Sequence, residues 1–487
     1  MSGSVSVVEL LERLARLEAS LAERDARIVV LTRRVAELEA ALRKDSRTSS
    51  KPPSSDGPRK APTRSRREPS GRPPGKQPGD PGRALRQVAR PDEVVVHAPA
   101  ACAGCGDPLD RAPVTSVETR QVFDLPPVRL HVTEHRLQHR RCRCGTVTMA
   151  TAPPATGAPA QYGPRVRAAG AYLAGYQHLP YQRACETLSD LLGVTMSTGT
   201  LTSIMDRTSH ALGPFLTAVR DQLTHAPVAH FDETGLRVAG TSAWVHSAST
   251  TTLALFTVHP TRGQDAMTDA GVLPTFTGTA VHDGWTPYRR YGTNRQLCNA
   301  HHLRDLAGIL DLDPTQTWAA DMTRLLCEIH DMTRTARTNN ADTLHPRLLT
   351  SYRQRYQAII TAGKTANPAP KHRPTRPPRH ATAEPPPQRQ RRTPAVNLLA
   401  RLHGFANDVL RFAHDLTVPF DNNLAERDIR MVKLRQKISG GLRTWTGATT
   451  FCTIRSYLST TRKHGINALE ALTQLHNGNT WMPPTTT

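Results

Sequence analysis

The segment from Val228 to Val238, VAHFDETGLRV, constrains the fold of this chain more than any other segment. Its apolar residues predict a short strand, but Asp232 and Glu233 stand in the middle of it. Carboxylates are disfavoured in strands, and a buried one needs a compensating partner. A metal ion is the simplest partner. The alternative for a single aspartate is an ordinary cap, turn or ion pair.

Two further segments repeat this combination of apolar residues and an acid. Residues 278–287 read GTAVHDGWTP and place Asp283 directly after an apolar run. Residues 420–430 read FDNNLAERDIR and predict a helix start, followed by Glu426. Three such places in one chain favour a common cation site over three unrelated caps.

The order of the expected elements predicts an α/β domain in which the first two acids meet. Strand patterns at residues 243–250 and 253–259 follow the strand of Asp232, and the strand of Asp283 comes after a short connection. A right-handed crossover would place the two acidic strands side by side. Two carboxylates at such close quarters repel unless a cation lies between them. Magnesium or manganese, bound through carboxylates and phosphate oxygens, fits that arrangement.

The charge balance indicates an anionic partner. The chain has 487 residues, and its 63 Lys and Arg residues against 41 Asp and Glu residues give a net charge of +22. Such a field favours nucleic acid or another polyanion. No apolar run reaches the roughly 18–20 residues of a membrane span, and the N-terminus lacks a signal peptide pattern. We therefore expect a cytoplasmic protein without membrane contact.

The N-terminal segment, residues 7–43, carries a seven-residue apolar repeat with Arg24 as its single polar interruption. One heptad position holds Val7, Leu14, Leu21, Ile28, Val35 and Leu42, and the other holds Leu10, Leu17, Leu31 and Leu38. The repeat predicts a coiled coil that joins copies of the chain into a homo-oligomer. The alternative is a lone helix packed on the body of the protein.

Residues 44–93 differ in composition from the segments on either side. They are rich in Pro, Ser, Gly, Lys and Arg. A segment of this kind cannot bury enough apolar surface to fold, so we expect a disordered basic linker. It serves either as a tether or as a weak, salt-sensitive contact to phosphates.

Four of the eight cysteines form two short pairs within residues 94–150. The pairs are Cys102 with Cys105 and Cys142 with Cys144, and a glycine follows each pair directly. In a reducing compartment this spacing predicts one structural zinc ion in a small zinc-ribbon-like β module. The interval between the pairs reads as strand-rich. The module either contacts DNA through its basic residues or acts only as a structural clip.

Residues 160–225 show the apolar spacing of helices. Gly193 is a predicted helix stop, and the Ser197 segment predicts the start of another helix. A helix-turn-helix pair that binds DNA fits this pattern, and a plain helical subdomain fits it equally well.

Four motifs give the chain a resemblance to a known family. DETG, HDGW-x-PY, CNAHHLRDL and DNN-x-AER together are similar to motifs of the insertion sequence 66 family of bacterial transposases. The likeness extends over nearly the whole chain. It implies a multidomain α/β fold with a ribonuclease H-like catalytic core, whose DDE triad would be Asp232, Asp283 and Glu426.

The resemblance also implies how the core is divided. Residues 226–310 would form its first part, and residues 398–475 its last part, with the Glu426 helix and basic C-terminal helices. The stretch between Asp283 and Glu426 is too long for a compact core, which predicts an insertion at residues 311–397. The insertion begins as helical, and its Pro/Arg-rich run at residues 363–395 is expected to be disordered.

The implied activity is DNA transposition, with metal-dependent cleavage at the element's ends followed by strand transfer into target DNA. Two Mg²⁺ or Mn²⁺ ions held by the three acids would serve this chemistry. The implied partners are terminal inverted repeats, target DNA and accessory proteins encoded by the element. The implied location is the bacterial cytoplasm, at the nucleoid when DNA is bound.

A further expectation concerns contacts to DNA phosphates near the triad. The candidates lie on the CNAHHLRDL and DNN-x-AER segments and just downstream: His302, Arg304, Arg427, Arg430, Lys433, Arg435 and Lys437. Each can equally be a salt-bridge partner or part of a solvated face. For the whole chain, the alternatives to a transposase are a metal-dependent nuclease or resolvase without strand transfer, and a catalytically inactive zinc-containing DNA-binding repressor.

Overall fold

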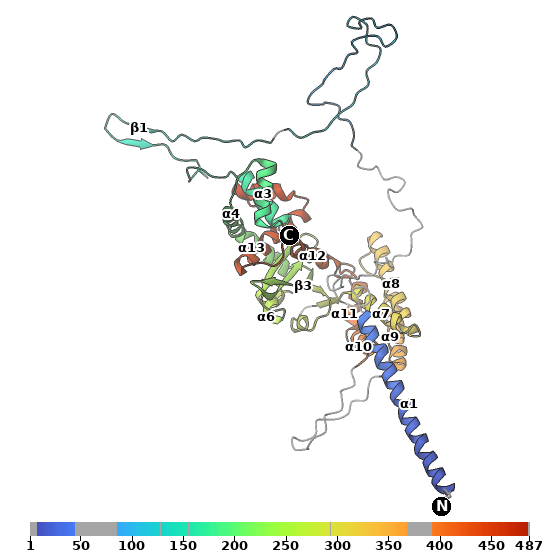
Figure 1. Ribbon diagram of the computed structural model, residues 1–487. Coiled ribbons are helices and arrows are strands. Elements are labelled where there is room, and N and C mark those ends of the chain that lie inside the picture. Colours follow the sequence, from blue (N-terminus) through green and yellow to red (C-terminus); the bar gives the residue numbers. More distant parts are fainter. Residues whose placement is uncertain are drawn as a thin grey trace, which may run out of the picture. The chain divides into compact units, whose positions relative to one another are not determined.

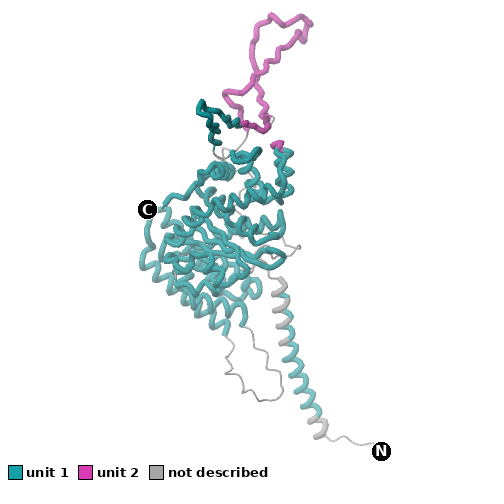
Figure 2. The backbone as a smooth tube through the Cα atoms, turned by 90° about the vertical axis from the view of Figure 1, so that its left-hand side faces the viewer, with its two compact units in different colours: residues 1–59, 135–190, 194–487 teal, residues 60–134, 191–193 magenta. Residues whose placement is uncertain are grey.

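The computed structural model describes residues 7–43, 85–126, 128–153, 156–292, 294–368 and 392–485. Most of the expected linker and most of the Pro/Arg-rich run lie outside these residues. The chain divides into two compact units (Figure 2): residues 1–59, 135–190 and 194–487 form one, and residues 60–134 with 191–193 form the other. None of the described helices combines the length and apolar character that a membrane span requires.

The heptad segment forms a single helix, α1 (Val7–Arg43), with the bounds that the sequence predicts (Figure 1). Its described heptad residues are all more than half exposed: Leu14, Leu17, Leu21, Ile28, Leu31 and Val35. Apolar side chains in this arrangement normally pack against a partner. Pairing of α1 with the same helix of a second copy of the chain, as a coiled coil, therefore stays a prediction.

The cysteine module contains fewer strands than its sequence predicts. Among the described residues of 94–150 there are two, β1 (His139–Arg141) and β2 (Val147–Met149), which pair antiparallel. Apolar residues of the preceding interval, such as Val117, Val122 and Val132, are exposed. A stable strand needs paired neighbours and a buried face. The prediction of a strand-rich interval was therefore wrong for these residues.

Residues 160–225 are helical, as the sequence predicts. The elements are α2 (Pro164–Ala171), the π-helical turn η2 (Tyr172–Tyr176), α3 (Tyr181–Leu192), α4 (Thr198–Ala211) and α5 (Gly213–Thr224). Gly193 follows α3 with a φ of +64°, a conformation that favours glycine. Ser197 caps α4 by accepting a hydrogen bond of 3.1 Å from the backbone N–H of Thr200.

A five-stranded sheet forms the centre of the larger unit. Its strands are β3 (Val228–Val238), β4 (Thr241–Ser249), β5 (Ala254–His259), β6 (Thr279–His282) and β7 (Asn294–Leu297). The spatial order is β5-β4-β3-β6-β7, antiparallel on the β4 and β5 side of β3 and parallel on the other side. The strand β7 was not predicted from the sequence, because NRQL has a single apolar residue and no strand pattern.

Two C-terminal helices pack on this sheet (Figure 1). They are α12 (Asn423–Ser439), which packs on β3, and α13 (Trp445–Lys463), which packs on β5, whereas α14 (Ala468–His476) packs on α2 and α13. Hydroxyl groups of α13 satisfy backbone N–H groups of β5. Ser456 accepts from Phe256 at 2.8 Å, and Thr460 accepts from Ala254 at 3.0 Å. The helix thereby protects an edge strand, whose N–H groups would otherwise be free to pair.

Short helices fill the connections around β6, and longer helices form a second core. The short ones are α6 (Gln264–Asp269), η3 (Leu273–Thr275) and η4 (Thr286–Arg290). The second core comprises α7 (Asn299–Leu312), α8 (Thr317–Thr338), α9 (Pro346–Ala366), α10 (Pro394–Gly404) and α11 (Ala406–His414). The predicted insertion thus packs with helices that flank it in sequence.

The helix α9 continues past Gly363, where the Pro/Arg-rich run was expected to begin. A Cβ atom at Gly363 would lie 2.6 Å from the Leu399 side chain and 3.0 Å from Trp318. A side chain here would force the packed neighbours to shift, so glycine allows close helix packing and does not mark the end of the helix. This corrects the start of the run to a position beyond Ala366.

Candidate active site

Asp232 lies on β3, and Asp283 directly follows the adjacent parallel strand β6. The last pair in the ladder between β3 and β6 is His230 with Val281. Two residues further along each segment, the same register leads to Asp232 and Asp283. Neighbouring strands are separated by about 4.8 Å. Two acids that are distant in sequence therefore lie beside each other.

The side chains of β3 alternate between two surroundings. His230 contacts Asn422 at the start of α12, at 2.9 Å. Phe231 packs instead against Phe276, with ring centroids 5.5 Å apart. Because successive strand residues face opposite sides of a sheet, Asp232 shares the α12 face with His230. Glu233 lies on the face of Phe231, so the two neighbouring acids have different environments.

Asn422 fixes the start of α12 to β3. Its Oδ1 accepts from His230 Nδ1 at 2.9 Å, and its Nδ2 donates to the Phe231 carbonyl at 2.8 Å. The backbone N–H of Asn422 donates to Cys298 Sγ at 3.2 Å. Asn422 is 1 % exposed, so protein groups alone satisfy its amide. The sequence predicts only a helix start here and gives no signal for this connection between Asn422 and β3, which positions Glu426 one helical turn later.

Glu426 reaches from α12 toward α7. Its Oε1 lies 3.5 Å from Arg304 Nη2 and 3.9 Å from His301 Nδ1. Among the described residues, Cys298, His301 and Glu426 form a group whose metal-ligating atoms all lie within 4.8 Å of one another. A Cys and a His three positions apart at a helix start are the sequence signal for this group. The sequence prediction used only the four paired cysteines and therefore did not include Cys298.

The acids of the site influence one another electrostatically. Burial, followed by the charges of Glu233 and Asp283, raises the pKa of Asp232 well above its usual range, and the charge of Glu426 adds to this. Burial also raises the pKa of Glu426, against the opposing charge of Arg304. A cation would relieve the repulsion among these carboxylates. Carboxylate oxygens are the ligands that Mg²⁺ and Mn²⁺ prefer, so the donor set fits these ions.

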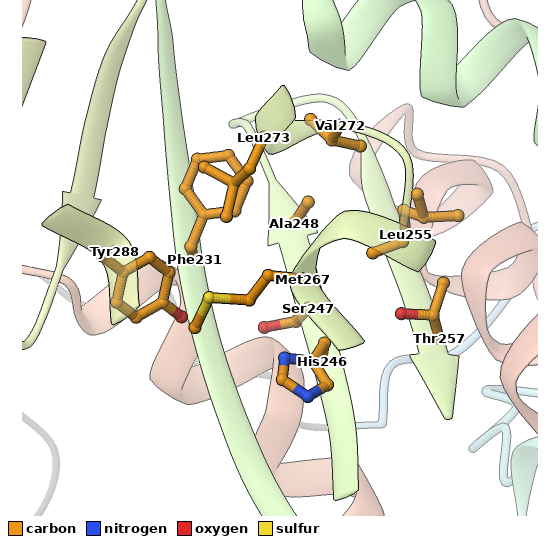
Figure 3. Close-up of a pocket in the computed structure, with 11 residues that line it drawn as sticks. Phe231, His246, Ser247, Ala248, Leu255, Thr257, Met267, Val272, Leu273 and Tyr288 are labelled. Carbon is orange, nitrogen blue, oxygen red and sulfur yellow. The ribbon is translucent and has the colours of Figure 1, made fainter. Parts of the chain in front are cut away.

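Glu233 is held in a buried network of its own. Arg262 donates to its Oε1 from Nε at 2.9 Å and from Nη2 at 2.6 Å. The Tyr288 hydroxyl donates to its Oε2 at 2.7 Å. Beside Tyr288 and Phe231 lies a cavity of about 20 Å³, also lined by His246 (Figure 3). A space of this size holds about one water molecule and no substrate.

The expected DNA-contacting residues differ in their exposure. Arg427, Arg430 and Lys437 are exposed on α12. His302 is only 1 % exposed, and its Nδ1 lies 3.0 Å from the Asn299 side-chain oxygen. Its burial rules out a direct phosphate contact in this structure.

Two other basic residues on α12 contact the protein itself. Lys433 donates to the Gly235 carbonyl on β3. Arg435 donates to the Gly440 carbonyl at 3.0 Å and lies 5.3 Å from the Phe451 ring centroid. Downstream, Lys463 pairs with Asp428 at 2.7 Å. The basic character of these helices is thus divided between internal contacts and the exposed residues of α12.

The two cysteine pairs form turns of the same design. Cys102 N–H donates to the Asp107 carbonyl at 2.8 Å, and Gly106 N–H donates to the Cys102 carbonyl at 2.9 Å. The second turn repeats this with Cys142 N–H to the Thr146 carbonyl at 2.8 Å and Gly145 N–H to the Cys142 carbonyl at 2.9 Å. Both glycines have positive φ, +82° and +91°. The glycine after each pair is therefore required by the turn.

These turns favour the thiolate form of cysteine. Hydrogen bonding to the Thr146 hydroxyl, followed by the Thr146 backbone, lowers the pKa of Cys144 to about 7. Backbone hydrogen bonds, with Cys105 first, lower the pKa of Cys102. Zinc binds thiolates, so both turns suit this metal.

The α/β fold, the crowded carboxylates and the net charge of +22 are typical of enzymes that process nucleic acids with divalent metals. Residues 159–450 match the model of the Transposase IS66 family, and residues 99–145 match the zinc-finger binding domain of transposase IS66. The first match covers more than half of the chain, which belongs to the Transposase IS66 family. The family resemblance and the zinc-binding module predicted from the sequence are thereby confirmed.

The N-terminal part of the chain matches a different model. Residues 6–86, which include α1, match a family of unknown function. No curated protein matches the chain.

Proposed function

We propose that the chain is a DDE transposase that cuts DNA at the ends of its element and transfers the freed strand into target DNA. The proposal is carried by the parallel register of β3 and β6, which leads directly to Asp232 and Asp283, and by the effect of the Asp283 charge on the pKa of Asp232. The start of the Glu426 helix is bonded to the same strand through Asn422. The sheet, with antiparallel strands on one side of β3 and parallel strands on the other, supports a ribonuclease H-like core.

Asp232, Asp283 and Glu426 would hold two Mg²⁺ or Mn²⁺ ions. When bound, these ions supply an activated water or hydroxyl nucleophile and neutralise the charge that develops on the phosphodiester. Asp232 would contact both ions, because the charges of Asp283 and Glu426 both raise the pKa of its carboxyl group. Arg304 favours the ionised form of Glu426 by its positive charge. The residues of α12 that face solvent, Arg427, Arg430 and Lys437, would contact DNA phosphates.

The remaining parts of the chain would organise the DNA complex. We assign Cys102, Cys105, Cys142 and Cys144 as the ligands of one structural zinc ion. We assign α1 to self-association, because its exposed apolar residues follow the heptad repeat. Terminal inverted repeats and target DNA are the proposed substrates, and proteins encoded by the same element are the proposed accessory factors.

The test uses purified full-length chain, Mg²⁺, labelled DNA with the element's ends and a target plasmid. A strand-transfer product supports the proposal. Cleavage without joining would instead indicate a nuclease or resolvase, and binding without cleavage would indicate a repressor. Cleavage without added divalent ions, in the presence of a chelator, would contradict the metal-dependent site.

A further inference from the structure

The network around Glu233 continues to a surface that the proposed triad does not use. The guanidinium carbon of Arg262 lies 4.0 Å from the Trp285 ring centroid and 5.0 Å from the Trp244 ring centroid. The chain has only five tryptophans, and two of them contact this one arginine. Glu233, whose side chain is 1 % exposed, holds the same arginine from the buried side.

Trp285 is fixed relative to Asp283. Its backbone N–H donates to Asp283 Oδ1 at 2.8 Å, and Gly284 between them has a φ of +89°. The Trp285 ring also meets Tyr288 edge-on, with centroids 6.5 Å apart. Tyr288 in turn donates to Glu233. An aromatic ring at this place therefore has a defined position beside a carboxylate of the candidate active site.

Core packing does not account for these side chains. Trp244, Arg262 and Trp285 are each only partly buried, and the Arg262 side chain is 36 % exposed. Because Arg262 is paired with Glu233, its charge is largely compensated and it is poorly suited to a phosphate. Its flat guanidinium group and the indole rings remain suited to stacking.

We propose that Trp285, supported by Arg262 and Trp244, is a stacking site for an unpaired nucleobase next to the phosphodiester that lies at Asp283. Enzymes that act within DNA commonly hold an unstacked base between aromatic or arginine side chains. Because the binding is by stacking, it should depend weakly on salt and tolerate different bases. This inference rests on the proposed function, since it places DNA at the carboxylates.

The test follows fluorescence of 2-aminopurine in element-end DNA, with the label moved one position at a time across the cleavage site. The protein is full-length chain with Asp232→Asn, so that the DNA stays intact. We expect strong quenching at one or two positions. Trp285→Ala should remove this quenching and weaken binding about 10-fold, whereas Trp285→Phe should retain most of it.

Trp445→Ala is the matched control, because Trp445 is also exposed but lies at the start of α13. It should leave the quenching unchanged. Equal quenching in the Trp285→Ala and parent proteins would overturn the proposal, and so would loss of quenching in Trp445→Ala alone. If Trp285→Ala fails to fold, Trp285→Phe serves as the test instead. Loss of the 2-aminopurine quenching in Trp285→Phe would then contradict the proposal.

The two proposals fail in different experiments. Absence of cleavage by the unmodified chain would remove the transposase function, while quenching at Trp285 would still report DNA stacking. Normal cleavage with no Trp285-dependent quenching would remove only the stacking site.

Discussion

The cysteine turns and the carboxylate site are both suited to metal ions, but they are assembled in opposite ways. Each turn closes within six residues through backbone hydrogen bonds, such as Cys102 N–H to the Asp107 carbonyl. The carboxylate site depends on the register of two strands and on a helix that Asn422 ties to one of them. A local site can be recognised from spacing, whereas the other site exists only in the folded sheet.

The largest expected effect tests the long-range site. Asp232→Asn should reduce DNA cleavage by about 10³-fold or more, because it removes the carboxylate that we propose contacts both metal ions. DNA binding should remain nearly unchanged, measured by gel shift on the same substrate. Asp331→Asn, on the exposed face of α8, is the control. Cleavage at the normal rate by Asp232→Asn would contradict the triad.

Loss of a local site should leave the distant core intact. Cys142→Ser should lower the zinc content from about one ion per chain to none, because a three-ligand site binds zinc much more weakly. The main thermal unfolding transition should not shift, since the sheet shares no ligand with the turns. Metal analysis and calorimetry check both statements. Cys327→Ser is the control, and an unchanged zinc content in Cys142→Ser would remove the assignment of its ligands.

The Asn422 connection tests whether the carboxylate site depends on the fold around it. Asn422→Ala removes the side-chain hydrogen bonds to His230 and to the Phe231 carbonyl, which should cost about 2–4 kcal/mol in the free energy of unfolding. Cleavage should fall further than the folded fraction does, because Glu426 loses its position. Urea unfolding and single-turnover cleavage provide the measurements.

Asn423→Ala is the neighbouring control, because Asn423 is exposed and its side chain donates a local hydrogen bond of 2.6 Å to Asp421. Similar losses in both variants would show that Asn422 has no special connecting role.

The smallest effect concerns the exposed basic residues. Lys437→Ala should weaken DNA binding a few-fold and reduce the slope of log affinity against log salt by about 0.9, because one phosphate contact is lost. Lys463→Ala should leave this slope unchanged, since Lys463 is paired with Asp428. A titration of binding at several salt concentrations distinguishes them. Equal slopes in the two variants would contradict the assignment of α12 to DNA.

The sequence by itself determined those features that depend on neighbouring residues. The heptads predicted α1 to its ends, Gly193 and Ser197 marked helix boundaries, and four motifs identified the family. The cysteine spacing identified the zinc module, because the turn hydrogen bonds join residues only a few positions apart.

Only the tertiary structure decided which side chains meet. His301 and His302 are adjacent in the sequence, but His302 is buried whereas His301 faces Glu426. Asn422 links α12 to β3 through a hydrogen bond to the Phe231 carbonyl. The Gln296 side chain on β7 accepts a hydrogen bond from the Phe412 backbone N–H at 2.9 Å. Polar contacts of this kind join residues more than a hundred positions apart, and their geometry is set by packing. A single sequence carries no local signal for them.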